Sequence, residues 1–388
     1  MNFDSILLEL SAIIVGAALL GTVFLYARQP IIIAYIAIGI IIGPSGLGLI
    51  RRPESIEQMA HLGVVLLLFI IGLNLQPGKL IKLFSKAIWL TFATSLLFAS
   101  VSTGFAMLIG LDLASALIFG AAMMFSSTVV GLKLIPTTTL HHKHTGEVMT
   151  SVLLLQDILA IIVILFISGE QNQHVLATFV FIIIKLVALW FTAFMGVRYL
   201  IIPLLNKFDS VQEYTFVLTL AWCLFWAEAA HLLGLSFETG AFVAGLSIAS
   251  RNVSLIVAEN LKPLREFFLI MFFFAVGAKL DLQMSPGLLL AAMVFGAVLV
   301  PLKVWVFKYA FKRSGEKTRL SGELAVRLGQ SSEFSLLVAF SALSAGLLTP
   351  EEMNVIQVAT IVTFVISTYW VVLKYPTPIS GSPVLRRD

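Results

Sequence analysis

The stretch that decides the fold is Ser151-Val-Leu-Leu-Leu-Gln156-Asp157-Ile-Leu-Ala-Ile-Ile-Val-Ile164. Asp157 is the only ionisable residue between Glu147 and Glu170, and it lies near the middle of an apolar run long enough to cross a bilayer. A carboxylate at that depth costs about 3 kcal/mol or more, so acidic residues inside membrane spans mark ion or proton paths by default. We therefore interpret Asp157 as the centre of a functional site; the alternative is an aspartate paired structurally with a neighbouring helix.

The composition indicates a polytopic, all-α membrane protein. Hydrophobic residues make up 59% of the 388 residues, charged residues make up 12%, and the mean hydropathy is +1.01. The apolar segments have helix length, which excludes a transmembrane β-barrel. Cys223 is the single cysteine, so an intrachain disulfide and a cysteine metal cluster are excluded. The lipid bilayer is the expected partner, and the net charge of +4 gives no reason to expect nucleic acid.

Hydrophobic periodicity predicts thirteen membrane spans, which together form a transmembrane domain over residues 1–373. Residues 374–388, rich in Pro, Ser and Gly, read as a tail. The predicted spans are 5–25, 29–48, 58–76, 85–110, 112–135, 147–169, 174–202, 212–233, 236–250, 264–281, 286–311, 320–346 and 351–373.

The positive residues predict the orientation. With the N-terminus outside, 19 of the 25 Lys and Arg residues fall on the cytoplasmic side. Only Arg51, Arg52 and Lys279 fall outside, and three more lie within spans. The N-terminus is therefore predicted outside and the C-terminus in the cytoplasm, in a membrane that is expected to be a bacterial inner membrane.

The sequence contains an internal repeat. The motif Phe-Ile-Ile-Gly-Leu-Asn-Leu around Gly72 is similar to Phe-Ala-Val-Gly-Ala-Lys-Leu around Gly277, 205 residues later. Ser331 follows Ser126 by the same 205 residues. The offset predicts repeats over about 5–169 and 212–373, joined by a helix at 174–202. One joining helix inverts the second repeat, as in many secondary transporters. Chance similarity between apolar helices is the alternative.

Two predicted spans are interrupted by small polar residues. Phe125-Ser126-Ser127-Thr128 interrupts 112–135, and Gly329-Gln330-Ser331-Ser332-Glu333 interrupts 320–346. Such clusters suit helices that unwind at mid-membrane and expose backbone groups to an ion or a carboxylate. Ser and Thr also serve in helix packing. We expect Ser126, Ser127, Thr128, Ser331 and Ser332 to contribute to an ion- and proton-binding site with Gln156 and Asp157.

Three of the other charges inside predicted spans are candidates for a charge-compensating role. Lys303 is the intramembrane cation that most needs a partner, and Asp157 is the candidate; the alternative is a lysine that snorkels to the inner interface. Arg327 and Glu333 are expected to compensate charges or helix ends on other spans, with direct ion binding as the alternative. No catalytic constellation is present, so the chain is not expected to be an enzyme, and no cofactor or resident metal is expected.

The chain resembles the monovalent cation:proton antiporter-2 family over about residues 10–373. The motifs that carry this resemblance are Tyr35-Ile-Ala-Ile-Gly-Ile-Ile-Ile-Gly-Pro44, Leu66-Leu-Leu-Phe-Ile-Ile-Gly72, Ser126-Ser127-Thr128, Gln156-Asp157, Gly240-Ala-Phe-Val-Ala-Gly245 and Glu333-Phe334.

The resemblance implies an NhaA-like fold: a dimerisation domain, hence a homodimer, and a core with two crossed, broken helices. It makes Asp157 the ion- and proton-binding aspartate and Lys303 its partner. Gln156, where some relatives have an acid, is similar to Kef-type potassium efflux systems. Those usually continue into a cytoplasmic nucleotide-binding regulatory domain. The sequence stops at Asp388, so we expect that domain to be absent or to have been removed.

These features predict a secondary antiporter that exchanges a monovalent cation, K⁺ first, for H⁺, with Asp157 binding either one. One titratable carboxylate predicts electroneutral exchange. Na⁺/H⁺ exchange is the alternative within this class. A gated cation channel and a sodium-coupled solute symporter are the rival classes, and no TVGYG-like filter supports the channel.

Overall fold

The structure is a computed structural model of the chain, and it describes residues 6–27, 29, 31–50, 54–74, 77–135, 144–168, 175–208, 211–235, 237–249, 253–280 and 284–377. Every element within these ranges is a helix, which confirms the all-α prediction. The helices belong to two compact units. The tail prediction for 378–388 lies outside the described residues.

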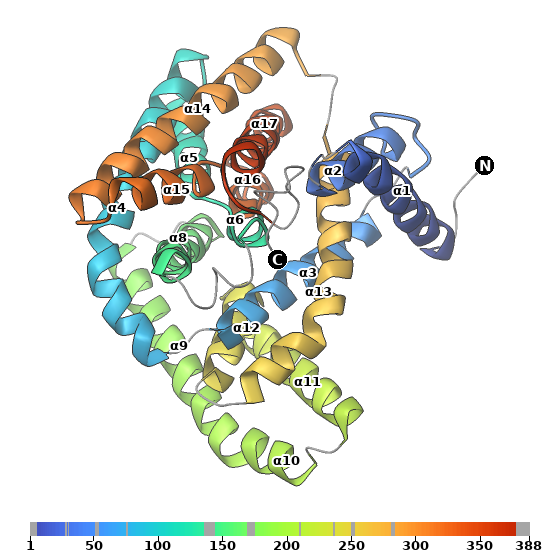
Figure 1. Cartoon of the computed structure of the whole chain (residues 1–388), viewed down its shortest axis with the longest axis vertical. Coiled ribbons are helices and arrows are strands. Elements are labelled where there is room, and N and C mark those ends of the chain that lie inside the picture. Colours follow the sequence, from blue (N-terminus) through green and yellow to red (C-terminus); the bar gives the residue numbers. More distant parts are fainter. Residues whose placement is uncertain are drawn as a thin grey trace. The chain divides into compact units, whose positions relative to one another are not determined.

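The first unit comprises Met1–Arg51, Lys82–Ser168 and Val276–Asp388. In Figure 1, α5, α6, α8, α15, α16 and α17 of this unit gather together, and α16 packs against α5, α8 and α17. Its described helices are α1 (Ile6–Tyr26), α2 (Ile31–Ile42), most of α4 (Pro77–Leu108), α5 (Leu113–Met123), α6 (Thr128–Lys133), α8 (His144–Ser168), α14 (Pro286–Arg313), α15 (Thr318–Arg327), α16 (Glu333–Ser344) and α17 (Pro350–Lys374).

The second unit comprises Arg52–Ile81 and Gly169–Ala275. Within it, α12 packs against α3, α11 and α9. Its described helices are α3 (Glu54–Asn74), α9 (Val175–Gly196), the π-helical turn η1 (Val197–Ile201), α10 (Ile202–Lys207), α11 (Gln212–Leu232), α12 (Phe237–Ile248) and most of α13 (Val253–Ala278).

Each of the thirteen predicted ranges coincides with a helix or with consecutive helices in the described residues. The predicted span 112–135 is α5 followed by α6, and 320–346 is α15 followed by α16, so both are broken as expected. Two boundaries differ. The helix predicted over 29–48 ends at Ile42, because Pro44 disfavours helical backbone at Gly43. The helix predicted to start at 264 begins at Val253 and continues through Pro263.

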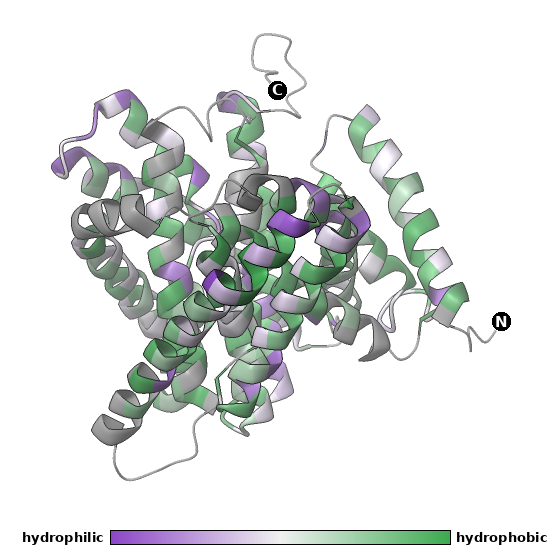
Figure 2. Ribbon diagram, turned by 90° about the horizontal axis from the view of Figure 1, so that it is seen from below, coloured by the Kyte–Doolittle hydropathy of each residue, from purple (hydrophilic) through white to green (hydrophobic). Residues whose placement is uncertain are grey.

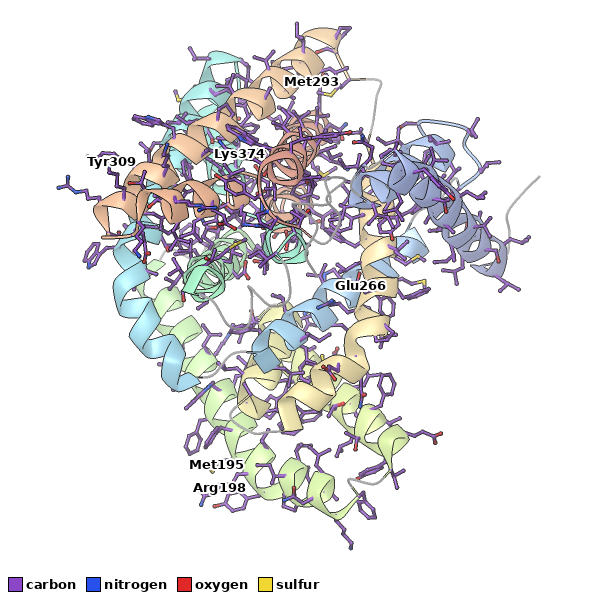
Figure 3. The ribbon with its side chains drawn as sticks, viewed as in Figure 1. Met195, Arg198, Glu266, Met293, Tyr309 and Lys374 are labelled. Atoms are coloured by element: carbon purple, nitrogen blue, oxygen red, sulfur yellow. The ribbon has the colours of Figure 1, made fainter. Side chains whose placement is uncertain are left out.

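The helices have the inside-out polarity of a membrane protein. On α4 the buried face carries hydroxyls, among them Thr94 and Ser102, while Trp89 on the opposite face is 77% exposed. On α14, Tyr309 projects away from the ribbon and is 60% exposed (Figure 3). Hydrophobic colouring predominates along the helices in Figure 2. Apolar side chains that face outward are favourable only where the solvent is lipid, so the chain is an integral membrane protein.

Six helical stretches in the described residues are long and apolar enough to cross a membrane by length and composition. They are Leu7–Tyr26, Ala87–Leu108, Ile184–Lys207, Glu213–Leu232, Pro286–Arg313 and Pro350–Lys374. Shorter apolar helices in the described residues account for the second, third and ninth predicted spans, for α5 and α16, which each flank one break, and for the Asp157 helix. Broken or short spans are tolerated where protein rather than lipid surrounds the exposed backbone.

The repeated glycines serve close helix contacts. A Cβ on Gly72 of α3 would lie 2.6 Å from Phe242 O of α12. A Cβ on Gly277 of α13 would clash with Ile36 O of α2 in the same way. These two glycines are 205 residues apart, and each lies on the third span of its predicted repeat. Gly72 lets α3 approach α12, the second span of the other repeat, and Gly277 lets α13 approach α2 in the same way. Only glycine permits backbones to come this close.

Candidate functional site

The first break lies between α5 and α6, and its backbone groups are held by side chains. The Ser127 hydroxyl accepts from Val130 N–H at 3.0 Å and so caps the start of α6. The Ser126 N–H donates to Gln156 Oε1 of α8 at 3.0 Å. These bonds replace the helical bonds that the break removes, which buried backbone requires.

The second break, between α15 and α16, is built in the same way. Ser332 caps α16, with Phe334 N–H donating to its hydroxyl at 3.1 Å. The Ser331 N–H donates to Thr363 Oγ1 of α17 at 2.9 Å. Ser331 and Ser332 lie 205 residues after Ser126 and Ser127, so residues at equivalent places in the sequence make equivalent bonds.

The two breaks lie against each other. The Ser126 hydroxyl donates to Leu328 O at 2.8 Å, and the Ser335 hydroxyl donates to Ala122 O at 2.6 Å. The Gln330 amide donates to Ser127 O at 3.2 Å. Four helix ends therefore meet in one place: the carbonyl ends of α5 and α15, which carry partial negative charge, and the amide ends of α6 and α16, which carry partial positive charge.

Lys303 of α14 lies at the carbonyl ends. Its ammonium donates to Phe125 O at 2.6 Å and to Gln330 O at 3.3 Å, one carbonyl from each break, and it lies 5.4 Å from the ring centroid of Phe98. The side chain is 0% exposed. Among the ion pairs formed by the described residues there is none between Lys303 and Asp157, so the predicted pairing is wrong for this conformation. The lysine balances the two negative helix ends instead.

Asp157 of α8 lies at the amide end of α6. Thr128 Oγ1, in the first turn of α6, is 3.1 Å from each carboxylate oxygen of Asp157. Asp157 is 2% exposed, and it has no ion-pair partner among the described residues. Glu333, in the first turn of α16, is a second buried carboxyl, and the Ser332 hydroxyl lies 3.5 Å from its Oε2. Among the described residues, Asp157 thus has one neutral hydrogen-bond donor.

Two buried polar groups within the site have no hydrogen-bond partner in the part of the chain that the structure describes. They are Gln156 Nε2 and Ser331 Oγ, and both residues are fully buried. The sequence led us to expect Gln156 in the ion- and proton-binding site. In the structure its Oε1 accepts from Ser126 N–H, which leaves that oxygen one further lone pair. Unpaired buried polar groups are costly, and they are common where a transient ligand or water completes the site.

Arg327 meets both a helix end on another span and a charge on its own helix. Its guanidinium pairs with Glu323 Oε1 at 3.0 Å, one turn earlier on α15, and donates to Leu134 O, just after α6, at 2.8 Å. It also donates to Pro376 O, after α17, at 2.8 Å. The helix-end prediction thus agrees with these contacts, but the compensating charge comes from α15 itself. The hydrogen bonds of Arg327 do not involve the other predicted site side chains.

The sequence interpretation missed three residues that hold the breaks in place: Gln330, Thr363 and Ser367. Ser367 Oγ donates to Gln330 Oε1 at 2.9 Å, and Thr363 binds Ser331 N–H as described above. A signal was present, because Thr360, Thr363 and Ser367 recur at helical spacing within an apolar span and are all fully buried. Polar residues on the inner face of a span are expected to have partners.

This arrangement can exchange one positive charge for another. An ionised Asp157 in a dry site needs a positive charge nearby. Thr128 is neutral and cannot supply one, and Lys303 is bound to carbonyls and makes no contact with Asp157. A proton or a monovalent cation would satisfy it. Among the described residues, no group of three or more His, Cys, Asp or Glu side chains could hold a metal ion.

Comparisons with known proteins agree with this architecture. A family model described as "Sodium/hydrogen exchanger, transmembrane" matches residues 11–374. The chain is 26% identical over 372 residues to a protein named iron transporter MagA from Paramagnetospirillum magneticum (strain ATCC 700264 / AMB-1), covering 94% of this chain and 84% of that protein.

The fold is shared with the sodium proton antiporter MjNhaP1 from Methanocaldococcus jannaschii. Its structure at pH 8 matches with a TM-score of 0.65 and 16% identity, covering 94% of this chain and 95% of that one. A second structure, from electron microscopy, matches with a TM-score of 0.69 and 15% identity, covering 96% of each chain. At this identity the likeness shows the fold alone.

Proposed function

Because the chain belongs to the sodium/hydrogen exchanger family, which comprises membrane transporters rather than enzymes, we propose that it is a secondary antiporter that exchanges K⁺ for H⁺ by alternating access. Cation/proton antiport is the general function that family membership supports. The choice of K⁺, the roles of the site residues and the charge balance are the parts that we propose.

The observation that carries the proposal is the environment of Asp157. An isolated ionised carboxylate in a dry site is unfavourable by several kcal/mol, and a hydroxyl bond returns only about 1.5–3 kcal/mol of this. The carboxylate is therefore stable in the closed site only when it is protonated or bound to a cation. Because the same two oxygens serve both occupants, one excludes the other, and this competition couples the two flows.

The same environment supports electroneutral exchange. Gln156 is neutral at every accessible pH, so the position next to Asp157 in the sequence adds no second charge, and we take Glu333 to keep one charge state throughout the cycle. Lys303 binds Phe125 O and Gln330 O rather than Asp157, so cation binding to Asp157 breaks no contact of this lysine. One proton would then be exchanged for one monovalent cation.

The preference for K⁺ rests on the kind of oxygens available. Gln156-Asp157 offers one carboxylate and one neutral amide oxygen, which form a weaker field than two adjacent carboxylates would. A weak field favours the ion that is easier to dehydrate, and K⁺ is easier to dehydrate than Na⁺. The Gln156-Asp157 pair, similar to that of Kef-type systems, points the same way. Na⁺ is the second candidate, because the family model is described by sodium/hydrogen exchange.

The test uses purified protein in proteoliposomes with an imposed pH gradient. Additions of K⁺, Na⁺, Rb⁺ and Li⁺ in turn should dissipate the gradient, with K⁺ at the lowest concentration. Fe²⁺ is included because a relative is named an iron transporter. A channel would pass K⁺ without moving protons, and a symporter would require an organic solute. Gradient loss with Na⁺ but not K⁺ would refute the proposed cation.

The proposal includes the setting of the protein. We propose a bacterial inner membrane with the N-terminus outside, inverted repeats over 5–169 and 212–373, and a homodimer that works with a cytoplasmic nucleotide-binding regulatory domain or subunit. Cysteines introduced at Gly78 and Gln171 should label from the cytoplasmic side and from outside, respectively. The native Cys223 is fully buried and should stay silent. The reverse labelling would overturn the orientation.

A further inference from the structure

The Gln330 side chain links the two breaks. Its Nε2 donates to Ser127 O at 3.2 Å, in the break between α5 and α6. Its Oε1 accepts from the Ser367 hydroxyl of α17 at 2.9 Å. Both Gln330 and Ser367 are buried. The amide is therefore anchored on α17 at one end and reaches the opposite break at the other.

Both ends of this link are occupied by protein groups. The Gln330 amide oxygen is bonded to Ser367, and its nitrogen is bonded to Ser127 O and lies 3.4 Å from where a Cβ on Gly131 of α6 would be. A glutamine bonded at both ends acts as a spacer of fixed length rather than as a free ligand. Ser127, whose carbonyl receives the amide, directly precedes Thr128, whose hydroxyl binds Asp157.

Lys303 also joins the same breaks, but its link depends on charge, unlike those of Gln330, Ser126 and Ser335. The Lys303 ammonium bridges Phe125 O and Gln330 O. The Gln330 link contains only neutral groups, so its bonds do not respond directly to the charge of the ion or proton at Asp157. The neutral link can therefore keep the spacing of the breaks constant while the occupant changes.

We propose that Gln330, held by Ser367, is a positioning residue that sets the spacing of the two breaks and thereby the size of the monovalent cation that the Asp157 site prefers. This inference rests on the proposed function, because it requires the cation to bind beside Asp157 between the breaks. Discrimination by size needs oxygens held at a fixed separation. Without a spacer of fixed length the oxygens can move to fit ions of different size, so the KM values for Na⁺, K⁺ and Rb⁺ become more alike.

The test compares KM values for Na⁺, K⁺ and Rb⁺ in proteoliposomes. Ser367→Ala removes the anchor, and Gln330→Asn shortens the spacer by one methylene, so that it cannot reach both partners. A neutral hydrogen bond stabilises by about 0.5–1.5 kcal/mol, which corresponds to about 2- to 12-fold in affinity. We expect the ratio of the highest to the lowest KM to fall about threefold or more in both variants.

The matched control is Thr368→Val. Thr368 is the next residue on α17 and is also buried, but its hydroxyl donates to Phe364 O within the same helix, at 2.6 Å. This variant should keep the wild-type KM ratio. A ratio of KM values from one preparation does not depend on how much of the protein is folded, so a purely structural defect leaves it unchanged.

Variants that transport too slowly can be compared by the rise in Tm of the purified protein with each ion, which reports binding to the folded state. Unchanged ratios in Ser367→Ala and Gln330→Asn, or an equal change in Thr368→Val, would overturn the positioning role while leaving antiport intact. A wild-type protein that exchanges no cation for protons would refute the proposed function and the positioning role together. A wild type that does not discriminate among the three ions would refute the positioning role and the preference for K⁺, while leaving cation/proton antiport intact.

Discussion

Replacing Thr128 with valine isolates the hydrogen bond that Asp157 receives within the described residues. Valine keeps the shape of threonine and removes the hydroxyl, which lies 3.1 Å from both carboxylate oxygens. Hydrogen bonds to charged groups contribute about 1.5–3 kcal/mol. Since 3.1 Å is longer than the usual range of about 2.5–3.0 Å for O–H···O bonds, the lower end applies.

The loss acts mainly on the ionised carboxylate. A hydrogen bond to a neutral, protonated carboxyl is about half as strong, so the change in the competition between cation and proton is about 0.8 kcal/mol. That corresponds to roughly 4-fold in affinity. The KM for K⁺ at fixed pH should therefore rise by this factor in Thr128→Val. At fixed K⁺, half-maximal exchange should move to higher pH by about 0.5 unit.

The assay is the initial rate of gradient dissipation in proteoliposomes, measured over a matrix of K⁺ concentrations and pH values. Thr128→Ser keeps the hydroxyl and should behave as the wild type, which controls for the lost methyl group. A Thr128→Val protein with wild-type KM and pH profile would show that Thr128 does not stabilise the ionised Asp157. If Thr128→Ser and Thr128→Val change the KM and the pH profile equally, the effect comes from packing and not from the hydroxyl.

Three further predictions follow from other contacts. Lys303→Met should lower the Tm, because two buried carbonyls lose their hydrogen-bond donor, at a cost of about 1–3 kcal/mol each before the structure relaxes. The same loss of Tm should be measured when the substitution is made in Asp157→Asn. If Lys303 and Asp157 formed an ion pair, the loss would disappear in that background. Gly245→Ala should destabilise the packing of α3 on α12 by about 3 kcal/mol, the upper end for overpacking, since its Cβ would clash with Phe69 O, and denaturant unfolding can measure this. A K⁺ jump on a solid-supported membrane should give no sustained current, and a sustained current that disappears in Asp157→Asn would contradict one-for-one exchange.

Much of the fold was readable from the sequence because the bilayer restricts the possible structures. Spans of apolar residues must be helices in lipid, so their existence and approximate ends follow from hydropathy. The breaks could also be located, since Ser126-Ser127 and Ser331-Ser332 recur at one offset and serine is a favoured helix cap. The helix ends near Pro44 and Pro263 could be misplaced by several residues, because tertiary packing decides whether a proline ends a helix.

The partners within the site were harder to predict. The sequence shows that Lys303 and Asp157 both lie at membrane depth, but it cannot show that unwound backbone offers Lys303 two carbonyls. For the same reason the role of Gln156 as acceptor for Ser126 N–H was hidden. The pairing of Arg327 with Glu323 was accessible, because the two are four residues apart on one helix, which is the spacing at which side chains meet.

The most direct measurement of the central claim is antiport by Asp157→Asn. Asparagine keeps nearly the volume of aspartate and can still bond to Thr128, but it cannot release a proton or neutralise a cation. Purified Asp157→Asn, with a Tm close to that of the wild type, is reconstituted beside the wild type and challenged with a K⁺ gradient. If Asp157 carries both ions in turn, the variant should dissipate no pH gradient at any K⁺ concentration or pH. Exchange at the wild-type rate in folded Asp157→Asn would contradict the claim that this carboxylate couples the two flows.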